Sequence, residues 1–103
     1  MIFKRLDIHD LILIEPTLFS DKRGYFYEKF KLKSLQQYVK YKLDFVQENE
    51  SRSNYGVVRG LHYQNAPREQ SKLVSVSSGE ILDVAVDIRD SSATYGKHIS
   101  VIM

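Results

Sequence analysis

Three basic side chains lie close together in a stretch of sequence that otherwise resembles β-strand. Arg59 and His62 fall within 57–64, and Lys72 follows ten residues after the histidine. An unpaired charge buried among apolar side chains costs several kcal/mol, so such a set is rare in the core of a strand. We therefore interpret the three groups as lining a cavity in which something anionic is bound and a proton is moved.

The three groups are those needed to remove a proton beside a carbonyl. A lone histidine is more often structural or merely exposed, but neighbouring cations favour the neutral imidazole, which can accept a proton near pH 7. A lysine can stabilise the negative oxygen that then develops, and an arginine can hold an anionic substrate. His9 and His98 have no such neighbours, and we interpret them as structural or exposed.

A metal site is the competing interpretation of this histidine. The metal-binding pattern of cupin proteins has a glycine, five residues, His-x-His and then a glutamate. Gly56, His62 and Glu69 fit that spacing, but Gln64 stands where the second histidine should be. One histidine and one glutamine make a poor transition-metal site, so a cupin-like barrel without metal is the better interpretation.

Length and composition are those of one globular domain or of part of one. The chain has 103 residues, no cysteine and a net charge of +2 at pH 7, which excludes a disulfide framework and gives no overall attraction to nucleic acid or membranes. The apolar run at 11–14 is too short for a signal peptide, and no run approaches transmembrane length. We expect a cytoplasmic domain without nucleic-acid or membrane partners.

The pattern of apolar residues predicts a mainly β domain with one helix. Leu32, Leu35, Val39 and Leu43 recur at helical spacing and predict a helix of about three turns over 31–42. Strands are expected at 11–15, 25–30, 45–51, 57–64, 72–77, 80–88 and 97–103, with turns at 21–24, 52–56 and 78–79. Strands at regular spacing with short turns indicate an antiparallel barrel or sandwich.

Alternation along the expected strand at 80–88 places its apolar residues on one face and Asp83 and Asp87 on the other. If the apolar face packs against a second layer, the two aspartates face a lumen, and the reverse packing is the open alternative. We interpret them as structural hydrogen-bonding groups, although one of them could orient His62 or pair with Lys72.

Side-chain parity sets a condition on the predicted cavity. Gln47 and Asn49 are two residues apart and share one face of their strand. Arg59 and His62 are three residues apart, so in a regular strand their side chains lie on opposite faces and cannot both point into one cavity. A bulge at Gly60 would bring the two basic groups to the same side. We therefore predict a bulge at this glycine.

An aromatic-rich turn carries a second group of charges. Asp21, Arg23 and Glu28 surround the aromatic residues at 25–27. The turn is either a solvated hairpin or a platform on which a flat ring can stack, and its rings could also belong to a core or an interface.

The last expected strand, 97–103, is followed by no turn or cap within the sequence. A barrel with so few strands would leave long unpaired edges, which proteins normally cover. We therefore expect 1–103 to be the N-terminal portion of a larger single domain, or its edge to be covered by a partner chain.

Six linked motifs run in order from about residue 12 to the last residue: Asp21-x-Arg23-Gly24-x-Phe26-x-Glu28, Gln47-x-Asn49-x-Ser51, Arg59-Gly60-Leu61-His62-Tyr63-Gln64, Gln70-x-Lys72-Leu73-Val74, Gly79-x-Ile81-x-Asp83-Val84-x-Val86-Asp87-x-Arg89 and Ser92-x-Thr94-Tyr95-Gly96. Together they resemble the dTDP-4-dehydrorhamnose 3,5-epimerase family. The resemblance implies a cupin-type antiparallel jelly-roll barrel, here truncated and with one short helix. It also implies a homodimer that acts without metal or organic cofactor.

The resemblance further implies roles for individual residues. The family inverts C3 and C5 of dTDP-4-dehydro-6-deoxy-glucose on the way to dTDP-L-rhamnose. His62 would be the base that removes the protons next to the C4 ketone, and Lys72 would stabilise the enolate oxygen. The implied substrate contacts are Arg59 to diphosphate or sugar, Gln47 and Asn49 to sugar or nucleotide, and Arg23, Phe26 and Glu28 to nucleotide, across the dimer interface.

Two groups that the family uses have no counterpart in the sequence. These are the tyrosine that returns a proton to the opposite face of the sugar and the aspartate that pairs with the base; none of the seven tyrosines present is an aligned replacement. We therefore expect the chain alone to be inactive or nearly so. A nonenzymatic domain that binds nucleotide sugars or mediates dimerisation, and an epimerase that inverts only C3 or C5 of a related nucleotide sugar, are the open alternatives.

Overall fold

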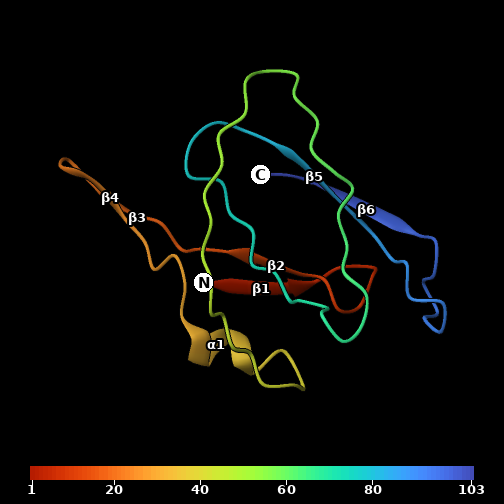
Figure 1. Cartoon of the computed structure of the whole chain (residues 1–103). Coiled ribbons are helices and arrows are strands. Elements are labelled where there is room, and N and C mark those ends of the chain that lie inside the picture. The colour runs from red at the N-terminus through yellow and green to blue at the C-terminus, as the bar shows by residue number, and fades with distance from the viewer.

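The computed structural model describes residues 1–103 and consists of three separate antiparallel strand pairs and one short helix (Figure 1). The pairs are β1 (Ile2–Arg5) with β2 (Ile12–Glu15), β3 (Phe19–Asp21) with β4 (Gly24–Phe26), and β5 (Leu82–Val86) with β6 (His98–Ile102), and the helix is α1 (Leu32–Gln36). The predicted mainly β class with one short helix is confirmed. No helix here combines the length and apolarity needed to cross a membrane.

The pair β1–β2 lies beside α1 and carries much of the packing (Figure 1). The ring of Phe3 in β1 stacks on Tyr38 with a centroid separation of 4.4 Å, and the guanidinium of Arg5 donates to the carbonyl of Tyr38. Strand β2 was predicted, but β1 was not. Its order of two apolar and then two basic residues lacks the alternation by which a half-buried strand is recognised.

Helix α1 is much shorter than the predicted helix at 31–42. It ends at Gln36, whose side chain donates through Nε2 to the carbonyl of Tyr41 at 2.8 Å and accepts at Oε1 from the backbone N–H of Leu43 at 2.8 Å. Leu35 and Leu43 are both buried, so their helical spacing marks two buried positions and not one continuous helix. The predicted helix length is wrong because a side-chain amide closes a turn where helical hydrogen bonds were expected.

The strands predicted at 45–51, 57–64 and 72–77 are absent, and these predictions are wrong. Between residues 44 and 80 the backbone forms only two hydrogen bonds to itself, Val57 N–H to Asn54 and Arg68 N–H to Asn65, both in turns. Figure 1 shows this part as a long irregular trace. An extended segment becomes a strand only when a neighbouring strand supplies its hydrogen-bond partners, and no such neighbour lies beside these three segments.

The predicted bulge at Gly60 is also wrong, because there is no strand ladder for it to interrupt. Gly60 nevertheless has a φ of 119°, a backbone conformation that glycine adopts readily and other residues rarely reach. Glycine is therefore favoured at this position by the positive φ of the backbone and not by a bulge between paired strands.

The burial of β5 shows which of its two faces packs against the rest of the chain. Asp83 and Ala85 are half-buried and Asp87 is buried, whereas the opposite, apolar face of β5 is open to solvent. The exposed fractions on that face are 64% for Leu82, 37% for Val84 and 36% for Val86. The aspartate face is therefore the one that lies against the chain, and the apolar face has no covering layer here.

The Gln36 turn gives a direct test of the helix end. Gln36→Ala removes the acceptor of the Leu43 N–H, and a hydrogen bond of this kind is worth about 1 kcal/mol. The Leu43 amide is then expected to exchange with solvent about fivefold faster, as measured by NMR hydrogen exchange. Gln37→Ala, at an exposed neighbour, is the matched control and should leave this rate unchanged; an unchanged rate in Gln36→Ala would contradict the assigned role.

Candidate functional site

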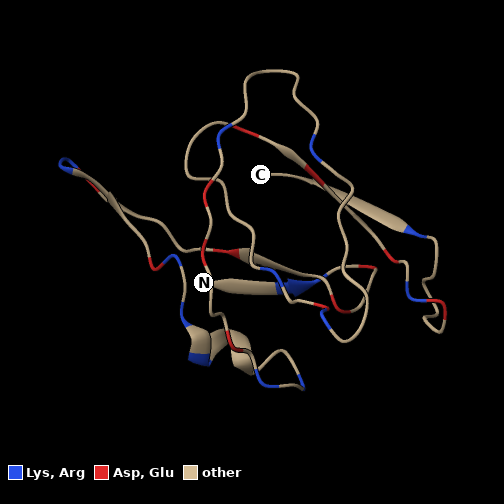
Figure 2. Cartoon of the chain, in the orientation of Figure 1, with Lys and Arg blue, Asp and Glu red and all other residues tan.

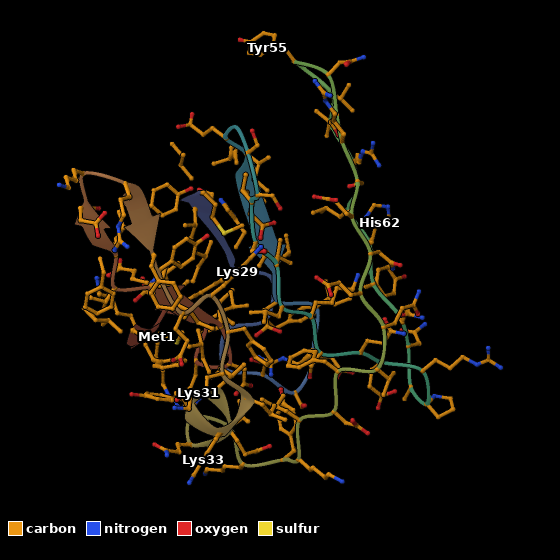
Figure 3. The ribbon with its side chains drawn as sticks, turned by 90° about the vertical axis from the view of Figure 1, so that its left-hand side faces the viewer. Met1, Lys29, Lys31, Lys33, Tyr55 and His62 are labelled. Atoms are coloured by element: carbon orange, nitrogen blue, oxygen red, sulfur yellow. The ribbon has the colours of Figure 1, made fainter.

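Arg59 and His62 lie on the extended segment 57–64, which stands away from the strand pairs (Figure 3). The guanidinium of Arg59 donates through Nε to Oγ of Ser53 at 2.8 Å and through Nη2 to the carbonyl of Arg52 at 2.9 Å. These bonds hold the arginine against the preceding turn. Its Nη1 is left free for an external anion.

The imidazole of His62 lies close to Gly60. A Cβ added at Gly60 would lie 3.4 Å from Nδ1 and 3.7 Å from Cε1 of His62, which is ordinary van der Waals contact. The ring forms no hydrogen bond with the rest of the chain. Both the lack of a bonded partner and the exposure of His62 leave the imidazole available to a ligand.

Lys72 is exposed and forms no ion pair within the chain. No hydrogen bond joins it to His62 or Arg59, and the structure brings no three histidine, aspartate or glutamate side chains together in a metal-binding group. Because all three basic groups are open to solvent, the cavity predicted around them stays a prediction.

Gln47 and Asn49 are brought together as their parity predicted. Nε2 of Gln47 donates to Oδ1 of Asn49 at 3.2 Å, and both residues are exposed. The shared side is confirmed although the segment is not a paired strand. Adjacent amides on one side of an extended segment offer both donors and acceptors to a polar ligand.

The hairpin β3–β4 carries the other predicted site residues and projects from the rest of the chain (Figure 1). At its tip, which Figure 2 shows as basic, Nη2 of Arg23 donates to Oδ2 of Asp21 at 2.6 Å and the Arg23 backbone N–H donates to Oδ1 at 2.8 Å. These hydrogen bonds lower the pKa of Asp21, and the carboxylate in turn raises the pKa of Arg23.

Aromatic rings line an open depression beside this ion pair. Phe26 faces Phe19 across the strand pair, and the two are 72% and 63% exposed. Tyr25 lines the same depression and stacks on Tyr27 with centroids 6.0 Å apart. Glu28, two residues beyond the strand, is exposed. Exposed rings next to a guanidinium suit a ligand that has both a flat ring to stack and an anionic group to pair with the arginine.

The most developed polar cluster centres on Asp87 and was not recognised as a cluster from the sequence. Asp87 is 5% exposed, and its carboxylate accepts from Nε and Nη2 of Arg89, both at 2.9 Å. The hydroxyls of Ser92 and Thr94 each donate to Oδ2 at 2.6 Å. The hydrogen bonds from Arg89, followed by those from the two hydroxyls, hold the pKa of Asp87 far below its usual range.

This cluster confirms the interpretation of Asp87 as a structural group. Asp87 is fully engaged by its own loop, so it does not orient His62. Arg89 also pairs through Nη1 with Asp10, which ties the loop after β5 to the turn between β1 and β2. The donors at 89, 92 and 94 follow Asp87 within seven residues, so the sequence places them near it. Asp10 is far away in sequence, and nothing in the sequence indicated its contact with Arg89.

The family model described as dTDP-4-dehydrorhamnose 3,5-epimerase matches residues 5–103. The chain belongs to this family. The dTDP-4-dehydrorhamnose 3,5-epimerase of Shigella flexneri is 50% identical over 97 residues, which are 94% of this chain and 54% of that protein. The relative from Escherichia coli K12 is 43% identical over 99 residues, 96% of this chain and 54% of that protein.

Solved structures give the same result for the fold. The epimerase from Elizabethkingia anophelis superposes with a TM-score of 0.92 at 45% identity, over 100% of this chain and 56% of that one. The Legionella pneumophila 3,5-epimerase, solved with dTDP-4-keto-L-rhamnose, superposes with a TM-score of 0.89 at 48% identity, over 98% of this chain and 53% of that one. The predicted cupin-type fold is confirmed. The chain spans about half the length of the curated relatives it matches.

The charge of Asp87 gives a pH-dependent test. Asp87→Asn keeps the shape but loses the charge that binds Arg89, so the loop is expected to open more often. Since the folded-state pKa of Asp87 is lowered, its contribution is complete above the ordinary value of about 3.9 and is lost as the pH falls through the folded-state pKa. The ratio of Gly96 amide exchange rates, variant over wild type, should be highest above about pH 5 and fall in stronger acid.

Gly96 is the reporter because its N–H donates to the backbone carbonyl of Asp87. Asp90→Asn, at an exposed aspartate of the same loop, is the matched control and should leave the ratio near one. A ratio for Asp87→Asn that does not change with pH would contradict a role for the carboxylate charge.

Proposed function

We propose that this chain provides the base-bearing part of a dTDP-4-dehydrorhamnose 3,5-epimerase, an isomerase that acts by proton abstraction beside the C4 ketone of a dTDP sugar. The family match over residues 5–103 carries the proposal. The exposed imidazole of His62, with no bonded partner in the chain, and the unpaired ammonium of Lys72 support it.

The chemistry needs a base on one face of the sugar. A neutral His62 takes the proton from the carbon next to the ketone, and the electrons of that C–H bond form an enolate whose negative charge rests on the ketone oxygen. Lys72 stabilises this oxygen, because a fixed cation lowers the energy of a charge that develops only during the reaction. Return of a proton to the opposite face inverts the centre, and the same events at the second carbon complete the double inversion.

Substrate binding divides between two parts of the chain. The free Nη1 of Arg59 is suited to a diphosphate oxygen, and the Gln47–Asn49 amides are suited to sugar hydroxyls. The aromatic depression next to Arg23, with Phe26 and nearby Glu28, is suited to the nucleotide. The ligand of the Legionella relative, dTDP-4-keto-L-rhamnose, supports a dTDP sugar as the substrate class.

The position of the hairpin supports a homodimer. In Figures 1 and 3 the hairpin β3–β4 and the segment that carries His62 lie on opposite sides of the chain. One substrate cannot readily contact both within a single chain. In the dimer, Arg23, Phe26 and Glu28 of one protomer would complete the site built around His62 of its partner.

The base assignment is tested by solvent deuterium exchange at C3 and C5 of dTDP-4-dehydro-6-deoxy-glucose, followed by NMR. The 103-residue chain is expected to exchange these protons with little or no net epimerisation, because the acid that the resemblance implies has no counterpart here. His62→Ala should slow exchange about 10²- to 10⁴-fold, and Lys72→Met about 10²- to 10³-fold. His9→Ala is the matched control and should exchange like wild type.

Full turnover by the wild-type chain would contradict the expected inactivity, and exchange that survives in His62→Ala would contradict the base assignment. Calorimetric binding of the dTDP sugar without any exchange in the wild-type chain would favour the nonenzymatic nucleotide-sugar-binding alternative. Exchange at only one of the two carbons would favour a single-centre epimerase.

The shared-site arrangement is tested by mixing two variants. Arg23→Ala and Arg59→Ala should each lose binding of dTDP, as measured by calorimetry, because each removes one anchor from every site. In an equimolar mixture, half of the dimers contain one copy of each and carry one intact site, so about a quarter of all sites should recover. No recovery in a mixture shown by native mass spectrometry to contain the mixed dimer would contradict sharing.

A further inference from the structure

Charge is distributed unevenly along this chain. Residues 29–43, which we call the basic segment, contain five lysines and no aspartate or glutamate, whereas the rest of the chain carries ten basic and thirteen acidic side chains. The net charge of +2 therefore conceals a strongly basic segment on an acidic remainder. The expectation of no membrane partner rests on the net charge, but an anionic surface at close range is attracted by the local charge that faces it.

The lysines of the basic segment are all exposed, and no ion pair of the structure involves them: Lys29, Lys31, Lys33, Lys40 and Lys42. A solvated surface helix usually intersperses lysine with glutamate at a spacing of three or four residues, and this segment has no such partner. In Figure 2 it forms the lower edge of the chain and is marked in blue at α1 and at the turn after it. Figure 3 shows Lys31 and Lys33 at α1, on the opposite side of the view from His62, so this surface is separate from the candidate base.

Apolar side chains alternate with the lysines at both ends of the basic segment. Phe30 and Leu32 lie between the first three lysines and are each 43% exposed, and Tyr41 lies between the last two and is 54% exposed. The long stem of a lysine can lie along apolar surface while its ammonium group reaches a polar partner. Lysines interleaved with exposed apolar side chains are typical of a surface that lies in the headgroup region of a bilayer.

Two features favour an anionic bilayer over a nucleic acid as the partner. Every basic residue of the segment is a lysine, which acts as a point charge, whereas arginine provides the bidentate phosphate contacts that are common in nucleic-acid recognition. The rings of the segment are also engaged within the chain. Phe30 packs edge-on against Phe45 with centroids 5.8 Å apart, and the hydroxyl of Tyr41 accepts a hydrogen bond from Oγ of Ser71 at 3.1 Å. Base stacking needs a free ring, whereas the exposed aliphatic side chain of Leu32 suits the edge of the acyl region.

We propose that the basic segment is a docking surface for membranes rich in anionic phospholipid. Its ammonium groups pair with the lipid phosphates and the exposed side chain of Leu32 enters the boundary between headgroups and acyl chains. The binding is peripheral and reversible, since several lysines and a few apolar contacts give a far weaker attachment than a membrane-spanning helix. The proposal rests on charge and exposure within residues 29–43, and it does not require the proposed epimerase activity.

Co-sedimentation of the 103-residue chain with lipid vesicles tests the proposal. Vesicles of phosphatidylcholine alone are compared, at about 0.05 M salt, with vesicles that contain about one third phosphatidylglycerol. Each lysine close to an anionic bilayer strengthens binding about fivefold, so the partition coefficient should be at least about 100-fold higher for the anionic vesicles. Raising the salt to about 0.5 M should weaken this binding at least about tenfold, because exposed charges are screened.

Paired substitutions place the contact on the basic segment. The double variant Lys31→Gln with Lys33→Gln removes two charges at α1 and should weaken binding to the anionic vesicles about 25-fold. The double variant Lys22→Gln with Lys97→Gln removes the same charge at exposed positions outside the segment, and as the matched control it should bind within about twofold of wild type. Unchanged hydrogen exchange of the Leu43 amide in each variant establishes that the turn after α1 is intact.

Several outcomes would overturn the proposal. They are absence of binding to the anionic vesicles, equal binding to both kinds of vesicle, and an equal loss of binding in the two double variants. Tighter binding to a single-stranded or duplex DNA oligonucleotide at the same salt would identify nucleic acid as the partner and would also overturn it. Because none of these measurements uses a nucleotide sugar, their failure is distinguishable from failure of the epimerase proposal.

Discussion

Hydrogen bonding between neighbouring strands is the constraint on which the rest of this structure depends. Each sheet here is a local pair, with its strands joined by a connection within the chain, as in β1–β2 and β3–β4. The segments that carry the candidate base and the adjacent lysine have no such local partner. Because backbone geometry sets side-chain direction in a strand, pairing of these segments would also fix how His62 and Lys72 face each other.

Where the chain has no strand partner, side-chain hydrogen bonds provide order. The Asp87 carboxylate gathers donors from its loop and, through Arg89, reaches the turn that holds Asp10. The Gln36 amide ends the helix and holds the backbone of Leu43 in the same way. Both are local solutions to the same requirement, since a polar group withdrawn from water needs a bonded partner. They order the end of α1 and the loop after β5 in a chain with few buried apolar side chains.

The elements that local signals determine are predictable from the sequence. Strands β2, β5 and β6 and the turn at 21–24 follow from alternation and turn residues. The helix was predicted too long because spacing cannot distinguish one helix from a short helix and a turn that each contain a buried leucine, here Leu35 and Leu43. The motifs make His62 and Lys72 candidates, and their roles stay predictions. The contact between Asp10 and Arg89 joins residues far apart in sequence and has no periodic signature.

The closeness of Gly60 to His62 makes the two nitrogens of the imidazole inequivalent. The ring edge formed by Nδ1 and Cε1 faces the glycine, and Nε2 is not among the atoms nearest to that position. Nδ1 is therefore the nitrogen turned toward the chain's own backbone, and Nε2 is the one presented outward. No hydrogen bond within the chain holds either nitrogen, so the tautomer of His62 is set by whichever ligand bonds to the ring.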